Sequence, residues 1–130
     1  GMTATFYQIT NHLKNHAMID GERTKDLMKR GMKVESHTLS HVVLPNVNDA
    51  RLKSELADSK KILEALTGVP IRHIAYPGTA HNQRVRTAAK NAGYVTGTIM
   101  DPRTSTAKDD LMKLPRIMMT DDTNLQKVLP

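Results

Sequence analysis

The chain has 130 residues, of which 38% are hydrophobic and 25% charged, the proportions of a single globular domain. It contains no cysteine, which excludes disulfide scaffolds, thiolate metal sites and cysteine nucleophiles. The net charge is +6, but it is spread along the chain, and only 3% of the residues are aromatic. We therefore expect no nucleic-acid partner. No apolar stretch is long enough to span a membrane.

The first third of the chain alternates strand-like and helical patterns. Residues 4–9 are rich in β-branched and aromatic side chains, which predicts a strand. Residues 20–30 are predicted to form a helix that Asp20 caps and Gly31 ends. Residues 32–36 then predict a second short strand.

The longest predicted helix covers residues 49–67. Asp49 is expected to cap its start, and Gly68 is expected to end it. The apolar side chains that fall on one stripe at helical spacing are Leu52, Leu56, Leu63 and Leu66.

The remaining elements repeat the alternation. Residues 71–76 predict a strand, and Asn82 is expected to cap a helix that ends at Gly93. Two more strands are expected at residues 94–99 and 114–119, with the polar loop 101–110 between them. Strands alternating with helices predict a single α/β domain over residues 1–130 with a mainly parallel sheet.

Two polar segments follow predicted strands, where ligands bind in folds of this class. The first contains His37 and His41, which are four residues apart and could reach one metal ion from a helical turn. The second runs from Tyr76 to His81. The alternative for the histidine pair is two solvated side chains on a surface loop.

Other candidate side chains carry weaker signals. His12 and His16 have the same spacing as the first pair but lie in a polar stretch, and we interpret them as solvated. His81 could be a third metal ligand or a proton donor, or simply a surface histidine. Asp101 could be a carboxylate at a strand end or part of an ordinary Asp-Pro turn.

The segment from Gly31 to His41 resembles the metal-binding motif of the polysaccharide deacetylases of the NodB-homology type. Further similar segments occur in the family's order, and the resemblance covers nearly the whole chain. They are Ala4-Thr5-Phe6-Tyr7, Ile74-Ala75-Tyr76-Pro77-Gly78, Ala92-Gly93-Tyr94 and Leu114-Pro115-Arg116-Ile117.

This resemblance implies a (β/α) barrel and a metal-dependent hydrolase. Such enzymes remove acetyl groups from N-acetylated sugars in chitin-like polymers or peptidoglycan, with a divalent metal that is often zinc. His37 and His41 match the metal ligands, and the loop of Tyr76, Pro77 and Gly78 matches the substrate and oxyanion loop. Arg116 matches an arginine that helps to order the site, the alternative being a structural ion pair.

The sequence departs from the family pattern at both ends. The aspartate pair that supplies a metal ligand and the base would precede Ala4, and no histidine follows His81 to serve as the late acid. We therefore expect an N-terminally shortened member with an incomplete barrel, and catalytic residues cannot be assigned. Gly1 is interpreted as the remnant of a tag.

Two functions remain open at this point. One is a zinc-dependent N-deacetylase, and the other is an inactive, truncated scaffold that binds metal or sugar. In either case an exposed sheet edge predicts a homo-oligomer. No signal peptide is visible, which by itself indicates the cytoplasm, whereas members of the family usually act outside the cell or at its envelope.

Overall fold

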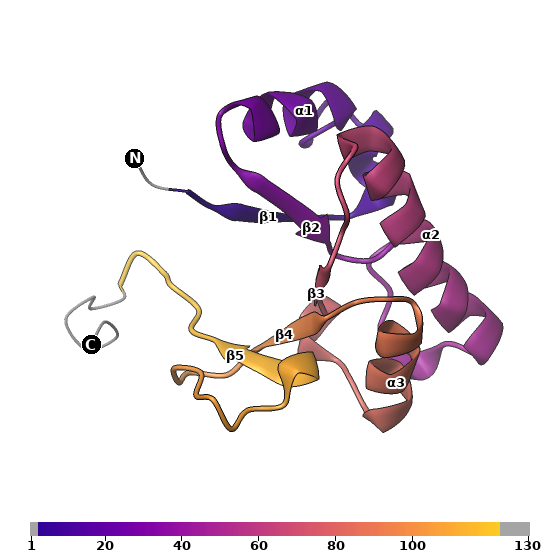
Figure 1. Cartoon of the computed structure of the whole chain (residues 1–130), viewed down its shortest axis with the longest axis vertical. Helices are drawn as coiled ribbons and strands as arrows, with labels where there is room; N and C mark the ends of the chain where they lie inside the picture. Colours follow the sequence, from indigo (N-terminus) through magenta and orange to yellow (C-terminus); the bar gives the residue numbers. More distant parts are fainter. Residues whose placement is uncertain (1–2, 123–130) are drawn as a thin grey trace.

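A parallel sheet in the order β1-β2-β3-β4-β5 organises the computed structural model, which describes residues 3–122 (Figure 1). Its strands are β1 (Thr5–Gln8), β2 (Lys33–Ser36), β3 (His73–Ala75), β4 (Thr96–Met100) and β5 (Leu114–Arg116). The α-helices are α1 (Gly21–Lys29), α2 (Asp49–Thr67) and α3 (Gln83–Asn91). The loops between strands and helices in residues 3–122 contain four short 3₁₀-helices, which are η1 (Thr10–Lys14), η2 (Leu44–Asn46), η3 (Pro77–Thr79) and η4 (Leu111–Lys113). The predicted α/β class and parallel sheet are confirmed.

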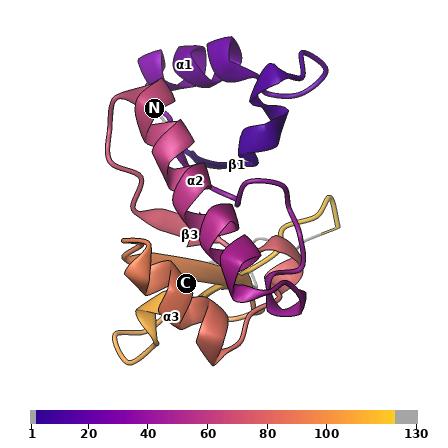
Figure 2. The same cartoon turned by 90° about the vertical axis from the view of Figure 1, so that its right-hand side faces the viewer.

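The sheet curves but does not close. The α-helices lie along one side of it, and the opposite side is open (Figures 1 and 2). The guanidinium carbon of Arg116 on β5 lies 5.3 Å from the ring centroid of Tyr7 on β1, so the two edge strands approach each other without pairing. The architecture is therefore the incomplete (β/α) barrel that the sequence predicts.

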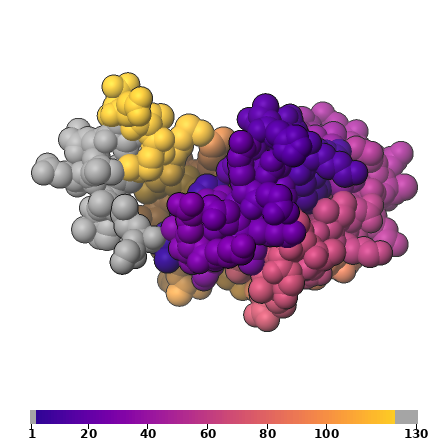
Figure 3. Space-filling model, turned by 90° about the horizontal axis from the view of Figure 1, so that it is seen from above, coloured from indigo at the N-terminus to yellow at the C-terminus, as the bar shows by residue number. Residues whose placement is uncertain are grey.

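The chain after β5 leaves the sheet. In Figure 3 this yellow segment lies at the opposite end of the molecule from α2. None of the helices in residues 3–122 is both long and apolar enough to cross a bilayer.

Side-chain caps fix where the helices begin. Asp20 accepts a hydrogen bond from the Arg23 N–H at 2.9 Å, and Asn82 caps α3 as predicted. The predicted cap of α2 was wrong. Asn48, not Asp49, accepts the Arg51 N–H, at 2.9 Å, because Asp49 is already helical and instead pairs with Arg84.

Strand β3 is shorter than the predicted 71–76 because a side chain takes the place of the ladder at its start. The buried Glu35 carboxylate accepts the N–H groups of Arg72 and His73 at 2.9 and 2.8 Å. At the other end of the sheet, β5 stops at Arg116 rather than at residue 119.

Helix α2 supplies much of the core, with Leu52, Leu56 and Leu63 each at most 2% exposed. Tyr76 lies in the same core. Its ring packs directly on Gly97, where an added Cβ would lie only 2.6 Å from the ring carbon Cζ. Glycine is therefore required at this position for the tyrosine to fit.

Candidate functional site

The histidines of the first predicted motif lie side by side at the carboxyl end of β2. The ring centroids of His37 and His41 are 4.8 Å apart, and the rings meet edge to face at 73°. The loop between them joins β2 to η2. The structure thus brings together the pair that sequence spacing singled out.

The orientation of His37 is fixed by the neighbouring strand. Its Nδ1 lies 2.7 Å from the main-chain oxygen of Ala75 at the end of β3. Because a carbonyl can only accept, Nδ1 must carry the proton, which leaves the lone pair on Nε2. A metal-ligating histidine is usually held in this way.

The surroundings of His37 favour its neutral form. Burial lowers the pKa of His37, and the charges of His41 and Arg116 lower it further, whereas the hydrogen bond to Ala75 acts in the opposite direction. A neutral imidazole is the form that binds metals.

The loop that carries both histidines has an unusual backbone. Thr38 and His41 have φ values of 70° and 62°, the left-handed region that residues with a side chain rarely adopt. The Thr38 N–H donates to Ser36 Oγ at 3.1 Å, and the His41 N–H donates to Thr38 Oγ1 at 3.1 Å. Polar side chains next to the histidines therefore hold this conformation.

Sequence reasoning missed one residue that contacts this loop. Glu55 on α2 is fully buried, and its carboxylate accepts the Ser40 N–H at 2.9 Å. A signal was available, since Glu55 lies on the leucine stripe of the helix and has Arg51 four residues before it. A charged residue on an apolar stripe indicates a partner inside the fold.

The predicted loop after β3 divides into a buried part and an exposed part. Tyr76 is 2% exposed, and its hydroxyl has no hydrogen-bond partner among residues 3–122; burial raises its pKa well above the usual range. Gly78 is exposed with a φ of 57°, and its N–H makes no hydrogen bond to another described residue. Only this second part offers a donor to a ligand.

His81 and Arg116, the auxiliary candidates, differ in their position. His81 Nδ1 lies 3.0 Å from Arg86 Nη1, and its ring lies beside Tyr76. Arg116 lies near enough to His37 to influence its charge, and its buried Nε has no hydrogen-bond partner within the described part of the chain. Arg116 therefore lies in the neighbourhood of His37 and over the Tyr7 ring, whereas His81 contacts α3.

The pair has no third metal-binding side chain beside it in residues 3–122. No group of three or more His, Asp or Glu residues in that range could hold a metal ion. Asp101 instead binds Arg103 at 3.0 Å. His16 is exposed and pairs with Asp20 at 2.7 Å.

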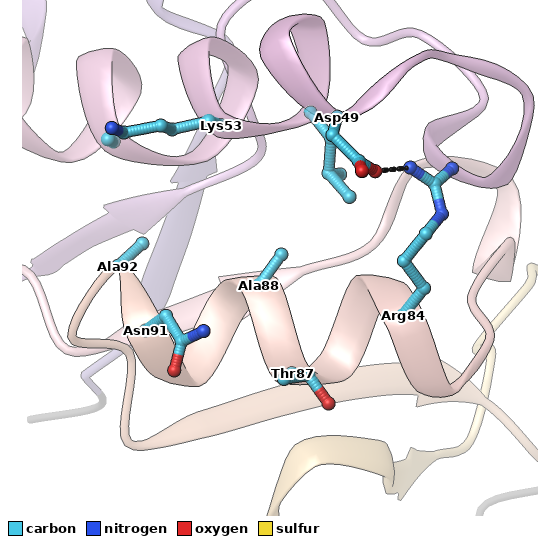
Figure 4. Close-up of a pocket in the computed structure, with 9 residues that line it drawn as sticks. Asp49, Lys53, Arg84, Thr87, Ala88, Asn91 and Ala92 are labelled. Atoms are coloured by element: carbon cyan, nitrogen blue, oxygen red, sulfur yellow. Dashed lines mark hydrogen bonds and ion pairs between the residues drawn. The ribbon is translucent and has the colours of Figure 1, made fainter.

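A hollow with a volume of about 500 Å³ lies elsewhere, between α2 and α3 (Figure 4). Apolar side chains such as Leu52 and Ala88 line it, and the ion pair of Asp49 with Arg84, 2.5 Å between Oδ1 and Nη1, stands at one end. Neither His37 nor His41 lines this hollow.

The fold agrees with comparisons to known proteins. Residues 1–97 match the family model described as polysaccharide deacetylase, and the chain belongs to this family. Among solved structures, a polysaccharide deacetylase from Bacillus cereus superposes with a TM-score of 0.87 at 28% identity, covering 98% of this chain and 40% of that one. A Streptococcus pyogenes deacetylase solved with acetate gives a TM-score of 0.92 at 25% identity, covering 98% and 59%.

A curated relative adds a substrate name. The peptidoglycan-N-acetylglucosamine deacetylase of Bacillus cereus is 30% identical over 93 residues, which cover 72% of this chain and 41% of the relative. The chain spans about two fifths of the length of the curated relatives that it matches.

Proposed function

We propose that this chain carries the histidine and substrate-loop part of a metal-dependent N-deacetylase that acts on amino-sugar polymers. The observation that carries the proposal is the pair of imidazoles at the end of β2, one of them held by the Ala75 carbonyl so that its lone pair is on Nε2. The peptidoglycan-N-acetylglucosamine deacetylase among its relatives supports the substrate class.

The donor set fits part of a metal site. Two neutral imidazoles suit a divalent ion such as zinc, which takes three protein ligands in catalytic sites. His37 and His41 would supply two of these ligands, and the third would come from outside residues 3–122 or from another protein chain. Zinc bound there would polarise the amide carbonyl and lower the pKa of a water molecule.

The chain's own residues would then bind and orient the substrate amide. The Gly78 N–H, which makes no hydrogen bond within residues 3–122, is a donor for the developing oxyanion. Arg116 adds positive charge beside His37, which favours a negatively charged reacting group. We assign no general base or acid within the described residues.

Zinc binding by calorimetry tests this proposal. We expect one ion per chain in the metal-free protein, with affinity at least tenfold weaker in His37→Ala and in His41→Ala because each loses a ligand. The matched control is the double variant His12→Ala/His16→Ala, which removes a pair of the same spacing and should bind as the parent does.

The opposite result would support the scaffold instead. If zinc binds weakly and the His37 and His41 variants leave the affinity unchanged, the pair is no metal site. The lack of a third ligand in residues 3–122 is the observation that favours that second function.

A further inference from the structure

We propose that Glu55 is a positioning residue that holds His41 beside His37 by binding Ser40. The inference rests on the proposed function only for its metal readout, because the contacts themselves are present without a metal. Glu55 touches neither histidine ring through a hydrogen bond, so its action is indirect.

Helix α2 holds two consecutive residues of the histidine loop at this one position. The Ser40 N–H donates to Glu55 Oε2 at 2.9 Å, and the Ser40 hydroxyl donates to Oε1. The Leu39 N–H donates to the main-chain oxygen of Glu55 at 3.2 Å. Side chain and main chain of one helical residue thus fix the centre of the loop.

The buried carboxylate of Glu55 would destabilise the fold if it had no charged or hydrogen-bonding partners. The Glu55 side chain is completely buried, and burying a charge without partners is strongly unfavourable. Arg51 Nη2 lies 2.7 Å from Glu55 Oε1 and donates to Ser40 Oγ at 2.8 Å. A leucine would fill the core here without these requirements, so the carboxylate indicates a specific task.

That task concerns His41 rather than His37. His37 is held independently by the Ala75 carbonyl. His41 follows Ser40 directly and has the unfavourable φ of 62°, and its ring makes no hydrogen bond to another described residue. Without the hydrogen bonds from Ser40 to Glu55, the backbone at His41 can relax and move its ring away from that of His37.

The test compares Glu55→Gln with Glu64→Gln. A glutamine at 55 keeps the shape but offers one oxygen where the carboxylate offers two, so either Ser40 or Arg51 loses its acceptor. Glu64 is a matched control on the same helix. It also pairs with a cation four residues before it, Lys60 at 2.7 Å, and also accepts a loop N–H, that of Ile71 at 3.0 Å.

Two readouts separate positioning from general stability. The first is the nuclear Overhauser contact between the rings of His37 and His41 in the metal-free protein, which a ring separation of 4.8 Å permits. The second is zinc affinity. We expect Glu55→Gln to lose the ring contact and to bind zinc about 10- to 100-fold more weakly, the usual effect of losing a residue that supports a ligand. Glu64→Gln should keep both the ring contact and the zinc affinity of the parent protein, and the melting temperatures of the two variants should be similar.

Each outcome decides the proposal. If Glu55→Gln keeps the ring contact, or if Glu64→Gln loses it equally, Glu55 has no positioning role. If the parent protein shows the ring contact but binds no zinc through the pair, the proposed function fails, and the ring contact in the variants alone decides the role of Glu55.

Ser40→Ala covers the case in which Glu55→Gln does not fold. This variant removes the hydroxyl between the loop and the carboxylate but leaves the ion pair of Glu55 with Arg51 in place. We expect a weaker ring contact with an unchanged fold, and an unaltered ring contact would contradict the route through Ser40.

Discussion

Because Gly97 has no side chain, the ring of Tyr76 fits into the core beside it. The ring of Tyr76 lies where a Cβ at this position would be, within 2.6 Å of Cζ. Tyr76, the first residue of the proposed oxyanion loop, is thereby anchored by a residue of the next strand, β4. The contact of Tyr76 with Gly97 thus fixes the position of the backbone from which Pro77 and Gly78 continue beyond the sheet.

Gly97→Ala should therefore destabilise the fold by about 1–3 kcal/mol, because the methyl group overpacks a site with no free volume. Thermal or denaturant unfolding measures the change. Gly21→Ala is the control, since its Cβ would meet Leu66 Cδ1 at an ordinary 3.5 Å. Equal stability of the two variants would show that the Tyr76 contact is less tight than described.

The residues of the site were predictable to different degrees. The four-residue spacing of His37 and His41 is visible in the sequence, as is the glycine of the loop after β3. The contact of Glu55 with Ser40 was not, because it joins two elements 15 residues apart and depends on how α2 is rotated on the sheet.

At the scale of elements, the start of α2 shows how a helix boundary depends on one side chain. The sequence Asn48-Asp49 offers two candidate caps, and both residue types are good ones. The structure uses Asn48, and Asp49 instead reaches Arg84 on α3.

Asn48→Ala should destabilise the protein by about 1 kcal/mol, because the Arg51 N–H loses its acceptor. Asp49→Ala should cost about 0.5 kcal/mol or less, because it removes only an ion pair whose carboxylate is 87% exposed. Chemical denaturation of both variants tests the order of the two effects, and the reverse order would return the cap to Asp49.

Element types were predictable where the pattern was periodic. The leucine stripe predicted the helix α2, Gly68 marked its end at residue 67, and the alternation of strands with helices predicted the parallel pairing of the sheet. The four 3₁₀-helices were not predicted, since such short turns carry no periodic signal. Strand β3 was predicted too long because Glu35 binds the backbone before His73, which no local pattern reveals.

For the whole molecule, the open sheet is the main consequence of the fold. Strands β1 and β5 form its edges within the described residues. Proline at position 115 weakens β5 as an edge because it lacks an N–H. Ala4, just before β1, and Gln8, its last residue, accept the N–H groups of Lys33 and His37. The alternating residues, Thr5 among them, therefore point their backbone groups outward.

We expect this β1 edge to pair with a second copy of the chain, as the sequence also predicts. Thr5→Pro removes an outward N–H at the first residue of the strand, where proline is tolerated, and should shift the protein toward the monomer. Sedimentation at several concentrations measures the change. Ser105→Pro, in an exposed loop, is the control, and a parent protein that is monomeric throughout would contradict the prediction.

The contact of Arg116 with Tyr7 also has a consequence for how the protein folds. It joins the first strand to the last, so forming it closes a loop over most of the chain, which costs conformational entropy unless the intervening strands are already paired. All neighbouring strands pair in parallel, which requires a crossover for each pairing and raises the contact order. Folding should therefore be slow for a chain of this size, and the environment of Tyr7 should be the last to become native.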